Sequence, residues 1–125
     1  MITALLVGAF GVAGALLRFA VDSWFANSFP ARHSHWPWTT LAVNVTGSFI
    51  IGAAIGGTAH WGLGPEWQSG LATGLAGGLT TFSSWTTATV RLASESRYRA
   101  ATLNVAANLI LGLAAAALGL SLTAL

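Results

Sequence analysis

The sequence contains no cysteine and no lysine, and charged residues make up only 6% of its 125 residues. The absence of cysteine excludes disulfide bonds and thiolate metal sites. A soluble domain carries about 25% charged residues, whereas 54% of this chain is hydrophobic, so an ordinary soluble domain is excluded too. All five basic residues are arginines, and they form no basic face that would indicate a nucleic-acid partner. Composition therefore predicts a protein of the lipid bilayer.

Carboxylate side chains are also scarce, with three in the chain. Asp22 lies near the end of an apolar run, and Glu66 and Glu95 lie in polar connections. A proton-coupled small multidrug transporter, which also uses four short helices, needs a carboxylate at mid-membrane. The sequence offers none there, so this class is disfavoured. An enzyme is not expected either, because no nucleophile with a base and no set of metal ligands stands in the polar connections.

Four apolar runs approach the length of about 20 residues that crosses a bilayer as a helix. They cover residues 4–25, 40–59, 70–90 and 100–124. The polar connections between them are too short to hold a soluble domain. We therefore expect one all-α membrane domain over residues 1–125, with four transmembrane helices. Glycines at four-residue spacing, such as Gly52 and Gly56, predict close packing between these helices.

The arginines of the connections predict the topology. Arg32, Arg91, Arg97 and Arg99 lie in the first and third connections, which an even number of crossings places on one side of the membrane. By the positive-inside rule that side faces the cytoplasm, and both termini face outward.

Polar side chains inside the apolar runs are the first candidates for a functional site. Asn44 lies in the second run, and Asn104 and Asn108 are four residues apart in the fourth run, so they share one helix face. Such amides either bond neighbouring helices together or line a polar track. Arg18 stands one turn before Asp22, so it could form an ion pair with Asp22 or extend its guanidinium to the membrane surface. The alternative is that Arg18 places a positive charge at the mouth of an anion path.

The stretch "GGLTTFSSW", residues 77–85, interrupts the third run. Gly77 and Gly78 weaken a helix, and the hydroxyls that follow can satisfy backbone groups freed by a break. We therefore expect the third helix to be broken, with carbonyls able to coordinate a small cation. Phe82 and Trp85 are three residues apart and point the same way, so their electropositive ring edges could attract an anion. Simple helix packing is the alternative for the same residues.

Three stretches carry a resemblance to a known family. "GALLRF" at residues 14–19, "TLAVNVTGSFIIG" at 40–52 and "GGLTTFSSW" at 77–85 resemble signatures of the Fluc (CrcB) fluoride channel family, and "LILGLAAAALG" in the fourth run adds support. The resemblance covers essentially the whole chain. It implies a fluoride-selective channel of the cell inner (plasma) membrane, built as an antiparallel dimer with two pores along the subunit interfaces. Passive export of fluoride would relieve fluoride toxicity.

The resemblance also assigns roles to residues of this chain. Asn44 and Phe82 match the family's pore residues, and Arg18 matches the arginine of its first helix, at the vestibule. Gly77 and Thr80 match the break whose backbone carbonyls hold a structural sodium ion at the dimer interface.

Three positions depart from the family pattern. Trp85 stands where the family usually has a second phenylalanine, and Asn104 and Asn108 stand where it usually has tyrosine and serine. An indole N–H and amide N–H groups can donate to fluoride as a hydroxyl does, so these residues remain candidates for the fluoride pore.

The distribution of arginines raises a question about assembly. The predicted topology places four loop arginines on one side and none on the other, whereas an antiparallel homodimer inserts best when arginines are balanced. The chain is therefore expected to form a homodimer or to pair with a homologous subunit of opposite orientation. In the second case it would be a non-conducting or partly conducting subunit of a heterodimeric fluoride channel.

Overall fold

The computed structural model describes the backbone of residues 1–125 and all side chains except those of His33 and Ser34. Every element of this described chain is a helix. In order they are α1 (Ile2–Ser28), α2 (Pro30–His35), α3 (Trp38–His60), α4 (Pro65–Ser69), the π-helical segment η1 (Gly70–Ala76), α5 (Gly77–Leu79), α6 (Phe82–Ser94) and α7 (Tyr98–Thr123).

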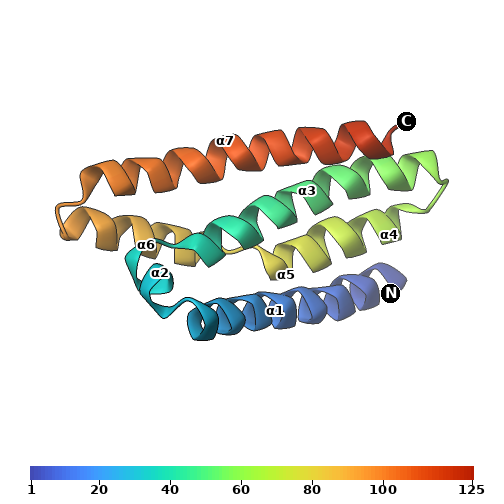
Figure 1. Ribbon diagram of the computed structural model, residues 1–125. Helices are drawn as coiled ribbons and strands as arrows, with labels where there is room; N and C mark the ends of the chain where they lie inside the picture. The colour runs from blue at the N-terminus through green and yellow to red at the C-terminus, as the bar shows by residue number, and fades with distance from the viewer.

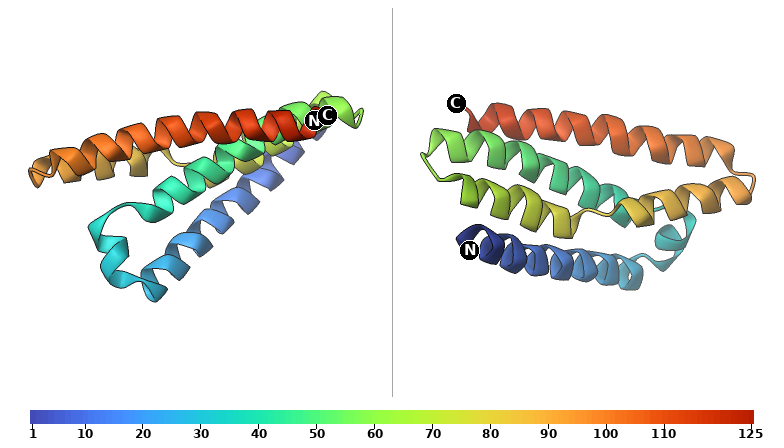
Figure 2. Two further views of the ribbon diagram at one scale, coloured as in Figure 1. Left: turned by 45° about the horizontal axis from the view of Figure 1, so that its top comes forward. Right: turned by 180° about the vertical axis from the view of Figure 1, so that it is seen from behind.

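The helices run side by side along one axis, with both chain ends at the same end of the bundle (Figure 1). Helix α3 packs along α7, the run from α4 to α5 packs on α1, and α6 packs on the first half of α7. The connections from α1 to α3 and from α6 to α7 lie at the opposite end from the termini. Helices α1 and α7 lie on opposite sides of the bundle, with α3 and the run from α4 to α5 between them (Figure 2).

Three of the four predicted runs coincide with single long helices. Residues 4–25 lie within α1, residues 40–59 lie within α3, and residues 100–124 lie in α7 except for the last one. Within the part of the chain that the structure describes, these three helices are long and apolar enough to cross a membrane. The prediction of an all-α chain with membrane-length apolar helices is confirmed.

The run at residues 70–90 folds differently from the expectation. Helical structure begins earlier, at Pro65, because proline suits the first turn of a helix, and continues through η1 to Leu79. Thr80 and Thr81 are then extended, with φ/ψ of −75°/159° and −146°/116°, before α6 begins at Phe82. Gly77 and its neighbour remain helical, so the break lies at the Thr80 end of the stretch in which it was expected and not at the glycines.

Thr81 explains why the second segment begins where it does. It is the N-cap of α6, and its hydroxyl oxygen accepts a hydrogen bond of 3.2 Å from the Ser84 N–H. A threonine in this position satisfies one of the free N–H groups of the first helical turn. The chain therefore leaves one helix and starts another within two residues.

Glycines set the spacing of the helices. A Cβ atom at Gly52 in α3 would collide with the carbonyl oxygen of Ala116 in α7, and one at Gly119 in α7 would collide with the carbonyl oxygen of Phe49. A Cβ atom at Gly14 in α1 would collide with the backbone of η1. In lipid, close backbone approach of this kind supplies much of the packing between helices.

Candidate functional site

The site is built around the two extended residues, Thr80 and Thr81. In an unbroken helix the Thr81 N–H would donate to the Gly77 carbonyl, but here it donates to Oδ1 of Asn44 over 2.8 Å. The Asn44 amide nitrogen donates back to the Thr81 carbonyl over 3.2 Å. The side chain of Asn44 therefore replaces both backbone partners of the buried Thr81.

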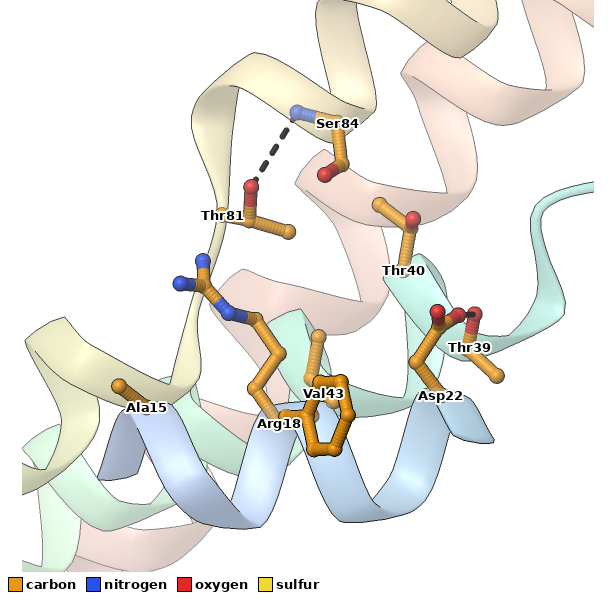
Figure 3. A pocket seen from close by; sticks show the side chains of 9 residues that line it. Ala15, Arg18, Asp22, Thr39, Thr40, Val43, Thr81 and Ser84 are labelled. Carbon is orange, nitrogen blue, oxygen red and sulfur yellow. Dashed lines mark hydrogen bonds between the residues drawn. The ribbon is translucent and has the colours of Figure 1, made fainter. Parts of the chain in front are cut away.

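Arg18 contacts the break from the other side. Its Nη1 donates to the Thr80 carbonyl over 3.1 Å. The guanidinium lies in a pocket of about 280 Å³ between α1, α3 and the start of α6, which Thr81 and Ser84 also line (Figure 3). Asp22 points elsewhere in this pocket, and its Oδ1 accepts from the Thr39 hydroxyl over 2.9 Å. The structure thus places a cation, a carboxylate and several hydroxyls around one hollow, and the guanidinium at the helix break is the part of it suited to an anion.

The three asparagines predicted as pore candidates meet in one network. Asn44 donates to Oδ1 of Asn108 over 3.0 Å, and Asn108 donates to Oδ1 of Asn104 over 3.2 Å. Asn104 then donates to the Thr89 hydroxyl over 2.9 Å. We call the side chains of Asn44, Asn108 and Asn104 the amide relay. The relay joins α3, α7 and α6, so it supports the alternative in which these amides bond helices together.

The aromatic pair of α6 forms beside this network. The rings of Phe82 and Trp85 meet edge to face, with centroids 5.6 Å apart and planes at 73°. The Phe82 side chain is 72% exposed, whereas the Trp85 indole N–H donates to the Asn104 carbonyl over 3.1 Å. The expectation that the two rings point the same way is confirmed. The indole N–H, however, is engaged within the chain.

The two carbonyls predicted to hold sodium are not equivalent. Gly77 is exposed, with open space where a Cβ atom would stand. In a continuous helix its carbonyl would accept from the Thr81 N–H, but that N–H donates to Asn44 instead. A free backbone carbonyl of this kind suits a sodium ion. The Thr80 carbonyl already accepts from the Arg18 guanidinium, whose charge would repel a second cation nearby. Gly77 therefore fits the predicted role and Thr80 fits it poorly.

Two residues of the site were not predicted from the sequence. Thr89 closes the amide relay, and its hydroxyl also donates to the Trp85 carbonyl over 2.8 Å. Thr39 binds Asp22 at the rim of the Arg18 pocket. Thr89 stands four residues after Trp85, so its position on the same helix face was the one available signal.

Comparison with known proteins places the chain in a family. The family described as CrcB-like protein, Camphor Resistance (CrcB), matches residues 5–120. This chain belongs to the CrcB family. The resemblance inferred from the three sequence stretches is thereby confirmed, and with its apolar helices the chain is a multi-pass membrane protein.

Individual relatives of the CrcB family are similar over nearly their whole length. A fluoride-specific ion channel FluC of Renibacterium salmoninarum is 52% identical over 121 residues, covering 94% of this chain and 96% of the relative. One of Pseudomonas putida is 43% identical over 118 residues, covering 94% and 93%. A protein of Bacillus cereus named fluoride-specific ion channel FluC 2 is 36% identical over 122 residues, covering 98% of both.

Proposed function

We propose that this chain is a fluoride-selective ion channel that lets fluoride leave the cell passively and so relieves fluoride toxicity. The observation that carries the proposal is the full-length similarity to CrcB relatives that bear the name of a fluoride-specific ion channel. The Arg18 guanidinium beside the helix break agrees with an anion as the transported species. The role is transport, not catalysis.

The proposed assembly is a single four-span domain that pairs with a second copy in antiparallel orientation in the cell inner membrane. The helical run at residues 65–79 and the 13-residue α6 are each shorter than the roughly 20 residues of a membrane-crossing helix, so they cross together as one broken span. The exposed Phe82 and the apolar groove beside it, lined by Trp85, Val90 and Val105, favour a subunit interface there. Phe82 and Asn44 belong to the proposed fluoride path, and the Gly77 carbonyl is the stronger of the two proposed sodium ligands.

The alternative of a non-conducting or partly conducting subunit in a heterodimeric channel is not favoured. Relatives that match this chain over more than nine-tenths of both lengths carry the name of the channel itself. We therefore propose a homodimer, in spite of the uneven distribution of loop arginines.

The proposal is tested by reconstituting the purified chain alone into liposomes loaded with potassium fluoride. A fluoride electrode records efflux after a potassium ionophore is added, and liposomes loaded with potassium chloride report selectivity. We expect rapid fluoride efflux and chloride efflux no faster than from empty liposomes. Folded protein that releases no fluoride by itself would contradict the homodimeric channel, and recovery on adding a homologous subunit would establish the subunit role instead.

Arg18 offers a second test of the proposed function. Arg18→Met keeps the apolar stem and removes the guanidinium, so the pocket loses the charge that concentrates anions. We expect fluoride efflux to slow by about tenfold or more, as removal of a steering charge does elsewhere. Arg99→Met is the matched control, because it removes the same charge from an exposed position at the start of α7. Equal slowing in both variants would mean that net charge, and not the Arg18 pocket, governs the efflux rate.

A further inference from the structure

All the amide donors of the amide relay are engaged inside the chain. An asparagine amide nitrogen carries two N–H donors. Those of Asn44 go to the Thr81 carbonyl and to Asn108 Oδ1, and those of Asn108 go to the Asn104 carbonyl, over 2.8 Å, and to Asn104 Oδ1. Those of Asn104 go to the Thr89 hydroxyl and, over 3.4 Å, to the Trp85 carbonyl. An ion that approached Asn104 or Asn108 would have to displace one of these bonds.

Burial separates Asn104 and Asn108 from the exposed part of the site. Asn104 is 0% exposed and Asn108 is 7% exposed, whereas Phe82, in the same part of the bundle, lies open on the surface. A residue that donates directly to a passing ion needs access to the path of that ion. Removing a buried donor from its partner without a replacement costs about 1–3 kcal/mol. Both observations argue against direct contact between these two amides and an ion.

The relay instead connects two elements of the proposed fluoride path. At one end Asn44 holds both backbone groups of Thr81 at the helix break. At the other end Asn104 and Trp85 bind each other twice, since the indole N–H donates to the Asn104 carbonyl and the Asn104 amide donates to the Trp85 carbonyl. The first bond holds the indole ring through a backbone carbonyl, and the second ties the Asn104 side chain to the backbone of α6, where the indole ring meets Phe82. The bonds from Asn44 to Asn108, from Asn108 to Asn104 and from Asn104 to Thr89 run in one direction, and such chains of hydrogen bonds strengthen one another.

We propose that Asn104 and Asn108 are positioning residues, which hold Asn44 against the helix break and tie α7 to the backbone of α6, without touching fluoride. The inference rests on the proposed function of a fluoride channel, and it withdraws two of the candidate pore residues from contact with the ion. Asn44 and Phe82 remain in the fluoride path. Trp85 contributes a fixed ring and not an N–H donor.

The test is a double-mutant cycle between Asn108 and Asn44, read as fluoride efflux per folded channel. Asn108→Ser keeps a hydroxyl donor but is too short to reach Asn44, and Asn44→Ser weakens the clamp on Thr81. We expect Asn108→Ser to slow efflux by about tenfold in the wild-type background and by less than about twofold in the Asn44→Ser background, because its effect passes through Asn44. Two independent fluoride ligands would instead give effects that multiply, and that result would overturn the proposal.

Three additions keep the outcome interpretable. Asn27→Ser, at an exposed position near the end of α1, is the matched control and should release fluoride as fast as the wild type. Midpoints of thermal unfolding for the four proteins of the cycle measure the same coupling without any transport, so additive shifts there would also count against the relay. If the wild type itself releases no fluoride, the proposed function fails while the unfolding cycle still tests the relay. If Asn108→Ser does not fold, Asn104→Ser in the same two Asn44 backgrounds makes the comparison one link further along the relay.

Discussion

Gly52→Ala is expected to prevent stable folding of this CrcB-family chain, although alanine normally favours a helix over glycine. The new Cβ atom would collide with the carbonyl oxygen of Ala116 and would lie 2.9 Å from the backbone nitrogen of Leu120. Both atoms belong to the backbone of α7, so no side-chain rotation relieves the collision and α3 must move away from α7. We expect a loss of more than about 3 kcal/mol in the free energy of unfolding, the upper range for overpacking. Thermal unfolding in detergent and the yield of monodisperse protein measure the effect.

Gly8→Ala is the matched control for this prediction. Gly8 also lies inside a membrane-length helix, but no heavy atom of another helix lies within 4 Å of the position of its Cβ atom. The substitution should therefore stabilise the chain by up to about 1 kcal/mol, the difference in helix propensity. Similar yields and unfolding temperatures for the two variants would contradict the close contact between α3 and α7.

Asn44→Leu is expected to reduce fluoride efflux by at least about a hundredfold, because it removes the clamp on the helix break. Leucine has the same branching and number of side-chain heavy atoms as asparagine but offers no hydrogen bond. The N–H and carbonyl of the buried Thr81, together with Oδ1 of Asn108, then lose their partners. Each buried polar group left unpaired costs about 1–3 kcal/mol, so the break should rearrange or the protein should unfold.

Two measurements separate these outcomes for Asn44→Leu. Efflux from liposomes reports the channel, and thermal unfolding reports the fold. Asn27→Leu, at an exposed position on α1, should leave both unchanged. Efflux at the wild-type rate in Asn44→Leu would show that the clamp on Thr81 plays no part in conduction, and it would remove Asn44 from the proposed fluoride path as well.

The long helices could be predicted from the sequence, whereas the helix break could be predicted only to within a few residues. The runs at residues 4–25, 40–59 and 100–124 are predominantly apolar, and in lipid such runs have to be helical. For the third run, the glycines and the hydroxyls that follow predicted a break between Gly77 and Thr80. The structure breaks at Thr80 and Thr81, where Arg18 and Asn44 supply hydrogen bonds from two other helices. Such bonds outweigh a propensity difference of about 1 kcal/mol, and they are invisible within a single segment.

For the site too, the sequence predicted which residues take part but not which groups they bind. Spacing alone placed Asn104 and Asn108 on one face, and the structure brings both of them to Asn44. Whether that face meets an ion or another helix depends on how α7 is aligned against α3 and α6. The spacing of residues within one helix gives no information on that alignment. For the same reason the sequence offered the Trp85 indole N–H as a donor for fluoride, when its acceptor is a backbone carbonyl on a different helix.

The position of the chain ends limits how two copies of this protein could be joined into one polypeptide. Both termini lie at the same end of the bundle, so the end of one copy and the start of a second copy in the same orientation are neighbours (Figure 1). A short flexible linker would therefore produce a parallel tandem. A fusion that reproduces the proposed antiparallel pair needs a linker that itself crosses the bilayer, which takes about 20 apolar residues as a helix. Gene duplication followed by simple fusion would thus yield the wrong orientation, whereas separate subunits avoid this geometric constraint.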